Sequence, residues 1–251
     1  MNYHPRRPWW RQPGVWILLA TLVGMAVTAA LGRWQLGRAA TKEAWASQRL
    51  AREQMPALDW TELRAAADAG ADLQPWHDRQ VVLDGVWLAD STVFLDNRPM
   101  GGQAGFYVLT LLRPLGGGPD VLVQRGWAPR RLDDRSAVPT VPTSNEPVRV
   151  HGRLTPPPSR LMALGPDSSG PIRQNIDLTA YAAERSTLVL AAAVQQAEPV
   201  LPADGLKRDW SRPDADVHKH YGYALQWFGL CLLMACLYVW FQLIAPRRSR
   251  S

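Results

Sequence analysis

Cysteine is almost absent from this sequence. The 251-residue chain has two cysteines, Cys231 and Cys236, and both lie in one apolar run near the C-terminus. The long segment from residue 33 to residue 219 contains none. That segment therefore folds without a disulfide and depends on an apolar core, which a chain of this length is able to bury.

Acidic residues are absent from both ends of the chain. The terminal tails hold six arginines and no Asp or Glu, so the rest of the chain has 22 basic and 22 acidic side chains. The formal net charge of +6 therefore belongs to the tails, at Arg6, Arg7, Arg11, Arg247, Arg248 and Arg250. A nucleic-acid-binding protein needs basic groups clustered on a folded face, so the pI near 9.7 does not indicate a nucleic-acid partner.

Charge is also missing from two long apolar runs, residues 14–32 and 221–245. Each is long enough to cross a hydrocarbon core about 30 Å thick at about 1.5 Å per helical residue. The sequence therefore predicts two transmembrane helices in contact with membrane lipid. A cleaved signal peptide, ending near Thr28 to Ala30, is the alternative for the first run, but its 17 apolar residues from Val15 to Leu31 exceed the usual length.

The basic tails predict the orientation of these helices. Short basic segments stay in the cytoplasm and long loops are translocated largely regardless of charge. We therefore predict a multi-pass protein of the plasma (inner) membrane, with cytoplasmic tails at residues 1–13 and 246–251 and an exported, periplasmic domain at residues 33–219.

The exported segment has the pattern of an α+β domain. Residues 41–71 predict two short helices broken at Met55-Pro56, the second starting at Asp59, and residues 175–184 predict a third. Period-two runs rich in β-branched and aromatic residues follow Pro75 and are bounded by predicted turns, such as Asp90-Ser91. They predict a small antiparallel β-barrel or sandwich with strands near residues 80–87, 91–96, 105–113, 120–127, 147–154 and 187–195.

Familiar catalytic signatures are absent. There is no nucleophile elbow, zinc-protease helix, Walker loop, dinucleotide glycine fingerprint or Cys-x-x-Cys-His haem-attachment motif. His77 and His151 are far apart in sequence and the exported segment has no cysteine, which disfavours a zinc or copper site there. An enzyme built from scattered residues remains the weaker alternative.

A histidine stands at the start of the second apolar run. From His220, helical steps place Tyr223, Trp227, Cys231 and Met234 along one face. Neutral imidazole can ligate haem iron, and aromatic and sulfur side chains can line a porphyrin. Aromatic residues beside a histidine are also ordinary interfacial anchors, and spacing alone favours that second interpretation.

Small residues recur every fourth position in the first run, at Ala20, Gly24, Thr28 and Gly32. Such seams allow two helix backbones to approach closely. The second apolar run of the same chain is the favoured partner, with another membrane subunit or a chance pattern as the alternatives.

Four motifs lie in order along the whole chain. Their residues are Gly32, Arg33, Trp34, Gln35, Leu36, Gly37, Arg38 and Lys42; Asp96, Asn97, Arg98, Gly102, Gly105 and Val121 to Pro129, including Arg125, Gly126 and Trp127; Gly152, Arg153 and Leu154; and His220, Tyr223, Gln226, Trp227, Phe228 and Gly229. Together these motifs resemble the surfeit locus protein 1 family. Gln124 stands where that family would have Asn, and His218 adds a second histidine beside the expected one.

The resemblance implies an assembly factor for cytochrome c oxidase and not an enzyme. It implies that the protein binds haem a transiently and helps to insert it into oxidase subunit I, with haem a synthase as a further candidate partner. His220 is the implied axial ligand, with His218 as the alternative, and Tyr223 and Trp227 would line the haem. A membrane scaffold that stabilises subunit I without haem, and a membrane-anchored envelope enzyme, are the competing functions.

The arginines of the motifs have two interpretations. They would pair with haem propionates or partner carboxylates, or else Arg33 and Arg38 would anchor the first helix to headgroups while Arg98 and Arg125 brace strand ends. The second interpretation is favoured for each arginine taken singly. Trp34, Trp127, Gly102 and Gly105 are expected to be core and turn residues.

Overall fold

The computed structural model describes residues 13–131, 133–134, 137–162, 170–200, 204–210 and 217–248. Most of the predicted N-terminal tail (residues 1–12) and the last three residues of the C-terminal tail lie outside these ranges. The chain divides into two compact units, one formed by Met1–Ser47 with Arg212–Ser251 and the other by Gln48–Ser211.

The first unit is helical. Helix α1 spans Pro13–Glu53 and enters the second unit with its last residues, while α4 spans Val217–Tyr238 and is followed by a π-helical segment, η3 (Val239–Ile244), and α5 (Ala245–Arg248). Two stretches, Gly14–Glu53 and Val217–Arg248, have a mean hydropathy of 2.1 at their most apolar and are long enough to cross a membrane. In their most apolar 18-residue stretches, only 6% and 0% of the residues are buried, whereas a core helix of a soluble protein is mostly buried.

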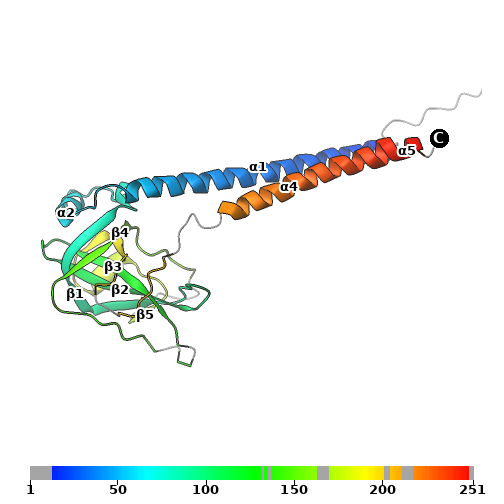
Figure 1. Cartoon of the computed structure of the whole chain (residues 1–251). Coiled ribbons are helices and arrows are strands. Elements are labelled where there is room, and N and C mark those ends of the chain that lie inside the picture. The colour runs from blue at the N-terminus through cyan, green and yellow to red at the C-terminus, as the bar shows by residue number, and fades with distance from the viewer. Residues whose placement is uncertain are drawn as a thin grey trace, which may run out of the picture. The chain divides into compact units, whose positions relative to one another are not determined.

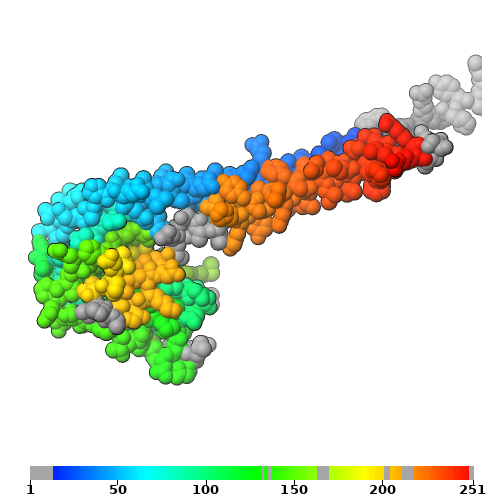
Figure 2. All heavy atoms as spheres, in the orientation of Figure 1, coloured from blue at the N-terminus to red at the C-terminus, as the bar shows by residue number. Residues whose placement is uncertain are grey.

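Helices α1 and α4 run antiparallel side by side (Figure 1). A Cβ added at Gly24 would lie 3.0 Å from the sulfur of Met234, and one added at Gly32 would lie 2.8 Å from the ring of Phe228. Figure 2 shows the atoms of α4 lying directly against those of α1. The prediction that the small-residue seam meets the second apolar run of the same chain is therefore confirmed.

The helices predicted between residues 41 and 71 are only partly correct. The break at Met55-Pro56 and the second helix are confirmed, since α2 spans Trp60–Asp68 and the carboxylate of Asp59 accepts the Glu62 backbone N–H at 2.8 Å. The first is not a separate short helix but the end of α1. No proline or glycine lies between Gly37 and Pro56, so nothing stops α1 before Glu53.

The second unit (Gln48–Ser211), called the sheet domain below, contains a six-stranded sheet. A short 3-10 helix, η2 (Gln74–Trp76), precedes it, and helix α3 (Leu178–Glu184) lies between its last two strands in sequence. The strands are β1 (Gln80–Leu95), β2 (Gly105–Pro114), β3 (Asp120–Pro129), β4 (Val148–Thr155), β5 (Ile172–Arg173) and β6 (Val189–Gln196).

The sheet is mixed, so the antiparallel part of the prediction is wrong, and the sheet is not a clear barrel. The order is β2-β3-β6-β4-β1-β5, with β1 also paired to β2. The β3–β6 and β1–β5 pairs are parallel and the others are antiparallel. Parallel pairing needs a long crossover connection. Here the chain between β3 and β6 passes through β4, β5 and α3, which the strand pattern did not reveal.

The strands expected at residues 80–87 and 91–96 are one long strand, β1. Asp90-Ser91 was expected to be a turn, but the strand continues with a register shift between Leu88 and Val93. Ser91 is buried, and its Oγ accepts the backbone N–H of Leu111 at 2.8 Å. The hydroxyl therefore replaces a missing ladder bond, and the strand bends without ending.

The core of this unit lies on the sheet and under α2. Leu58, Trp60 and Leu63 bring α2 onto the buried face of β1, β3 and β4. The indole N–H of Trp60 also donates to the carbonyl of Gly117 at 2.8 Å, in the turn between β2 and β3. A buried apolar core without a disulfide agrees with the prediction from cysteine content.

Candidate functional site

A hydrogen bond joins two motifs that are 185 residues apart. Gln35 lies on α1 and His220 lies in the first turn of α4, and Nδ1 of His220 is 2.8 Å from Oε1 of Gln35. Near it, the hydroxyl of Tyr221 donates to Oε1 of Glu43 at 2.8 Å. The first and last motifs of the resemblance are therefore brought together by the helix pair.

The stripe predicted along α4 is largely a helix-packing face. Sγ of Cys231 lies 3.6 Å from the backbone oxygen of Met25, and Met234 packs at Gly24. Trp227 is half-buried, whereas Tyr223 is 51% exposed. Only the part of the stripe near His220 is therefore left to contact a ligand.

Four other predicted residues of the helical unit are exposed. Arg33, Arg38 and His218 face outward, and Trp34 is 58% exposed, so its prediction as a core residue is wrong. Arg33 and Trp34 border an open groove of about 490 Å³ along α1, whose other walls are Ala26, Ala29 and Ala30. Trp34 is exposed because it lies on the face of α1 opposite the face that meets α4.

The central motif forms one corner of the sheet domain. Trp127 on β3 is fully buried, and its indole N–H donates to the backbone carbonyl of Arg98 at 2.6 Å. The ring covers Gly105 at the start of β2, where any Cβ would overlap it. A Cβ at Gly126 would lie 2.6 Å from Leu206. Trp127 is a core residue, as predicted, whereas Gly105 is a buried strand residue and not a turn residue.

The turn before this corner uses left-handed backbone. Asn97 has φ of 58° and Gly102 has φ of 77°. Asn and Gly are the residues that adopt this conformation most readily. Gly102 is therefore a turn residue, as predicted. Beside the turn, Asp96 pairs with Arg130 at 3.1 Å at the edge of a pocket of about 380 Å³.

Arg98 is a buried brace. Its Nη2 donates to the carbonyls of Ser159 at 2.9 Å and Gln174 at 3.2 Å, and its guanidinium lies 5.8 Å from the ring centre of Tyr107. Burial lowers the pKa of Arg98 from its ordinary value. The side chain holds two loops to the sheet.

Arg125 has the same role in a β-bulge. The register of β2 and β3 skips from Gly126 to Gln124, so Arg125 is the extra residue. Its guanidinium donates to Thr143 Oγ1 at 2.7 Å and to the Pro142 carbonyl at 2.6 Å, and it lies 4.7 Å from the ring centre of Trp87. Burial lowers its pKa to about 10. The contacts of both arginines match the bracing interpretation.

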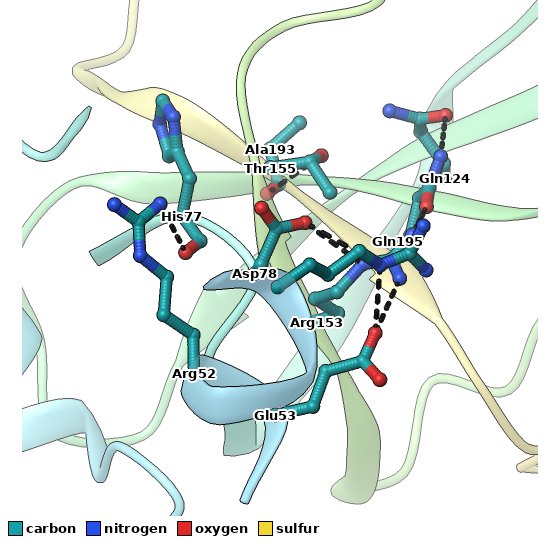
Figure 3. Close-up of polar contacts among 10 residues, drawn as sticks. Arg52, Glu53, His77, Asp78, Gln124, Arg153, Thr155, Ala193 and Gln195 are labelled. Atoms are coloured by element: carbon teal, nitrogen blue, oxygen red, sulfur yellow. Dashed lines mark hydrogen bonds and ion pairs between the residues drawn. The ribbon is translucent and has the colours of Figure 1, made fainter. Parts of the chain in front are cut away.

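Arg153, from the third motif, is the centre of a polar network in the second unit (Figure 3). Its Nη1 donates to Glu53 at 3.0 Å and its Nη2 to Gln195 at 2.6 Å, while Asp78 lies 3.8 Å from its Nε. Gln195 in turn donates to Gln124 at 3.5 Å. The network ties the last turn of α1 to β4, β6 and β3. Glu53 and Asp78 have no local sequence signal and were missed.

In the part of the chain that the structure describes, no three His, Cys, Asp or Glu side chains are placed to hold a metal ion. His77 is half-buried, and burial lowers the pKa of its imidazole. It lies beside Asp78 and the end of α1, with its carbonyl 3.5 Å from Nη1 of Arg52. This is a structural position in the second unit.

Comparison with known proteins connects these motifs to one family. The SURF1 (surfeit locus protein 1) family model matches residues 22–232. The chain belongs to the SURF1 family. It is also 25% identical over 234 residues to a SURF1-like protein of Rickettsia felis (strain ATCC VR-1525 / URRWXCal2), an alignment that covers 88% of this chain and 94% of that protein.

Membership in the SURF1 family carries a general functional statement. The family is linked to the assembly of cytochrome c oxidase and is membrane-associated. It is a family of assembly factors and not a known enzyme family. The resemblance drawn from the four motifs is thereby confirmed.

The residues near His220 fit the haem that the SURF1 resemblance implies. Oε1 of Gln35 is an acceptor, so the hydrogen bond to Nδ1 leaves the lone pair of a neutral imidazole on Nε2, which is the nitrogen that would hold the iron. Tyr223, one helical turn from His220, offers an exposed ring, and Trp227 lies two turns from His220 on the same face of α4. The donor set suits axial ligation by one histidine.

Proposed function

We propose that this protein binds haem a at the start of α4 and assists its insertion into subunit I of cytochrome c oxidase. His220 would hold the iron through Nε2, and Tyr223 and Trp227 would contact the porphyrin. Bound haem supplies an iron centre that needs an axial ligand. The observation that carries the proposal is the hydrogen bond from His220 to Gln35, because it joins two family motifs and orients one imidazole.

We also propose an orientation of the chain in the plasma membrane. Both termini would lie in the cytoplasm and the sheet domain in the periplasm, with α1 and α4 crossing the plasma membrane. Arg247 and Arg248 in α5 support this orientation, since basic residues next to a transmembrane helix stay inside. The contacts of Gly24 and Gly32 with α4 support an N-terminal helix that is retained. Protease added to spheroplasts should digest the sheet domain, and protection of that domain until lysis would contradict the orientation.

The haem test is the optical spectrum of the full chain, purified in detergent from cells that make haem a. We expect a reduced haem a band in the wild type, its loss in His220→Ala, and its retention in His218→Ala, because only His220 is oriented by a partner in α1. His218→Ala is a matched control, two residues away and exposed.

Two other results would contradict parts of the proposal. A band lost only in His218→Ala would move the ligand to His218. Wild-type protein without haem that still co-purifies with oxidase subunit I would leave a scaffold that stabilises subunit I as the function.

A further inference from the structure

Gln35 is the side chain that contacts the proposed haem ligand. Its amide oxygen lies 2.8 Å from Nδ1 of His220. Both side chains are half-buried between α1 and α4. Gln35 lies on α1 and contacts the imidazole of His220 directly, so its effect on that ring is the one considered.

The chemistry of this contact selects one form of the histidine. An amide oxygen only accepts hydrogen bonds, so Nδ1 of His220 must carry the proton. In a neutral imidazole the lone pair is then on Nε2. A metal-binding histidine commonly donates its other N–H to an oxygen in this way, which fixes the tautomer and the ring orientation.

We propose that Gln35 is a positioning residue that holds His220 in the Nδ1–H tautomer, with Nε2 directed to iron. This inference rests on the proposed function. It adds the residue that prepares the ligand and explains why the first motif and the last motif belong to one site.

The choice of an amide also has a consequence for haem release. A carboxylate at this position would make the imidazole more basic and the iron–nitrogen bond stronger. The neutral amide of Gln35 orients the ring with a smaller increase in basicity. That combination suits a protein that must hold haem and then release it to an acceptor.

The helix pair provides a matched control. The hydrogen bond from Tyr221 to Glu43 also joins α4 to α1 at 2.8 Å, one residue from His220. Tyr221→Phe removes this bond and leaves the histidine contact in place. Comparing it with Gln35→Leu separates a specific effect on the imidazole from a general loosening of the two helices.

The first measurement needs no haem. Nitrogen-15 NMR of the full chain, labelled at histidine and kept in detergent at alkaline pH, reports which ring nitrogen carries the proton. The spectrum of His220→Ala identifies the His220 signals among the five histidines. We expect the Nδ1–H form in wild type, Tyr221→Phe and Gln35→Glu, and a loss of that preference in Gln35→Leu.

Gln35→Glu also tests the orientation of the amide. If the amide nitrogen of Gln35 faced His220, the imidazole of the wild type would instead carry its proton on Nε2, which would then have no lone pair for iron. The carboxylate of glutamate can only accept a hydrogen bond, so Gln35→Glu would then move the proton of His220 from Nε2 to Nδ1. A changed tautomer in Gln35→Glu, or an unchanged one in Gln35→Leu, overturns the inference even where haem binds.

The second measurement uses haem a added to the same proteins. We expect Gln35→Leu to lower haem affinity about 10- to 100-fold, as loss of an outer partner of a metal ligand commonly does. Tyr221→Phe should keep wild-type affinity, and Gln35→Glu should shift the reduction potential to a more negative value. Equal losses in Gln35→Leu and Tyr221→Phe would overturn the positioning role. Wild type with the Nδ1–H tautomer but no haem binding would instead overturn the proposed function.

Discussion

Replacing Trp127 with alanine should lower the free energy of unfolding of the sheet domain by about 4 kcal/mol, which is typical of a buried tryptophan. The ring is fully buried, and its indole N–H donates to the carbonyl of Arg98. The ammonium of Lys207 lies 5.2 Å from the ring centre on one side, and Gly105 lies against the ring. Alanine would leave a cavity and an unsatisfied carbonyl at the same corner.

The measurement is chemical unfolding of the full chain in detergent, followed by the far-ultraviolet circular dichroism of the sheet. Trp127→Phe should cost about 2 kcal/mol, because it keeps an aromatic ring and loses the indole hydrogen bond. Trp34→Ala is the control, since Trp34 is 58% exposed in the helical unit and should leave sheet unfolding unchanged. Equal effects of Trp127→Ala and Trp34→Ala would rule out the role assigned to this corner.

Replacing Gly105 with valine should destabilise the same domain by about 3 kcal/mol through overpacking. A Cβ at this position would overlap both the Trp127 ring and the backbone oxygen of Ala128. Neither neighbour is the flexible end of a side chain, so the strand β2 or the ring must move. The backbone of Gly105 does not adopt a left-handed conformation, so the expected cost is steric.

Gly102 offers the contrasting control in the same motif. It has φ of 77° and open space where a Cβ would lie. Gly102→Ala should therefore cost about 1 kcal/mol from backbone strain alone, and Gly102→Asn should cost less because Asn adopts this conformation more readily. The same unfolding experiment distinguishes them. A Gly105→Val variant as stable as Gly102→Ala would show that the corner can repack around an added side chain.

Residue type alone did not predict the contacts of the motif arginines. Guanidinium chemistry made Arg98 and Arg125 candidates for binding propionates. The structure shows each guanidinium bonded to loop oxygens, of Ser159 and Gln174 for Arg98 and of Pro142 and Thr143 for Arg125. No local pattern predicts these loop partners, because they are distant in sequence and are mostly backbone carbonyls.

The strands were predicted from the sequence where their side chains alternate, and were missed or divided elsewhere. Period-two runs correctly predicted the positions of β2, β3, β4 and β6, since alternation follows directly from side-chain direction in a strand. Asp90-Ser91 was misjudged as a turn because a buried serine hydroxyl, bonded to Leu111, repairs the ladder there. The two-residue β5 is too short to have a periodic pattern.

By itself the sequence determined the apolar helices, the disulfide-free α+β domain, the family motifs and their order. These are local or compositional properties: length without charge, alternation, cysteine count and residue identity at fixed spacing. Only the tertiary structure decided that β6 pairs parallel to β3, that Trp127 closes a corner over Gly105, and that Gln35 meets His220. Each of these joins residues distant in the chain, and such pairings depend on how whole elements pack.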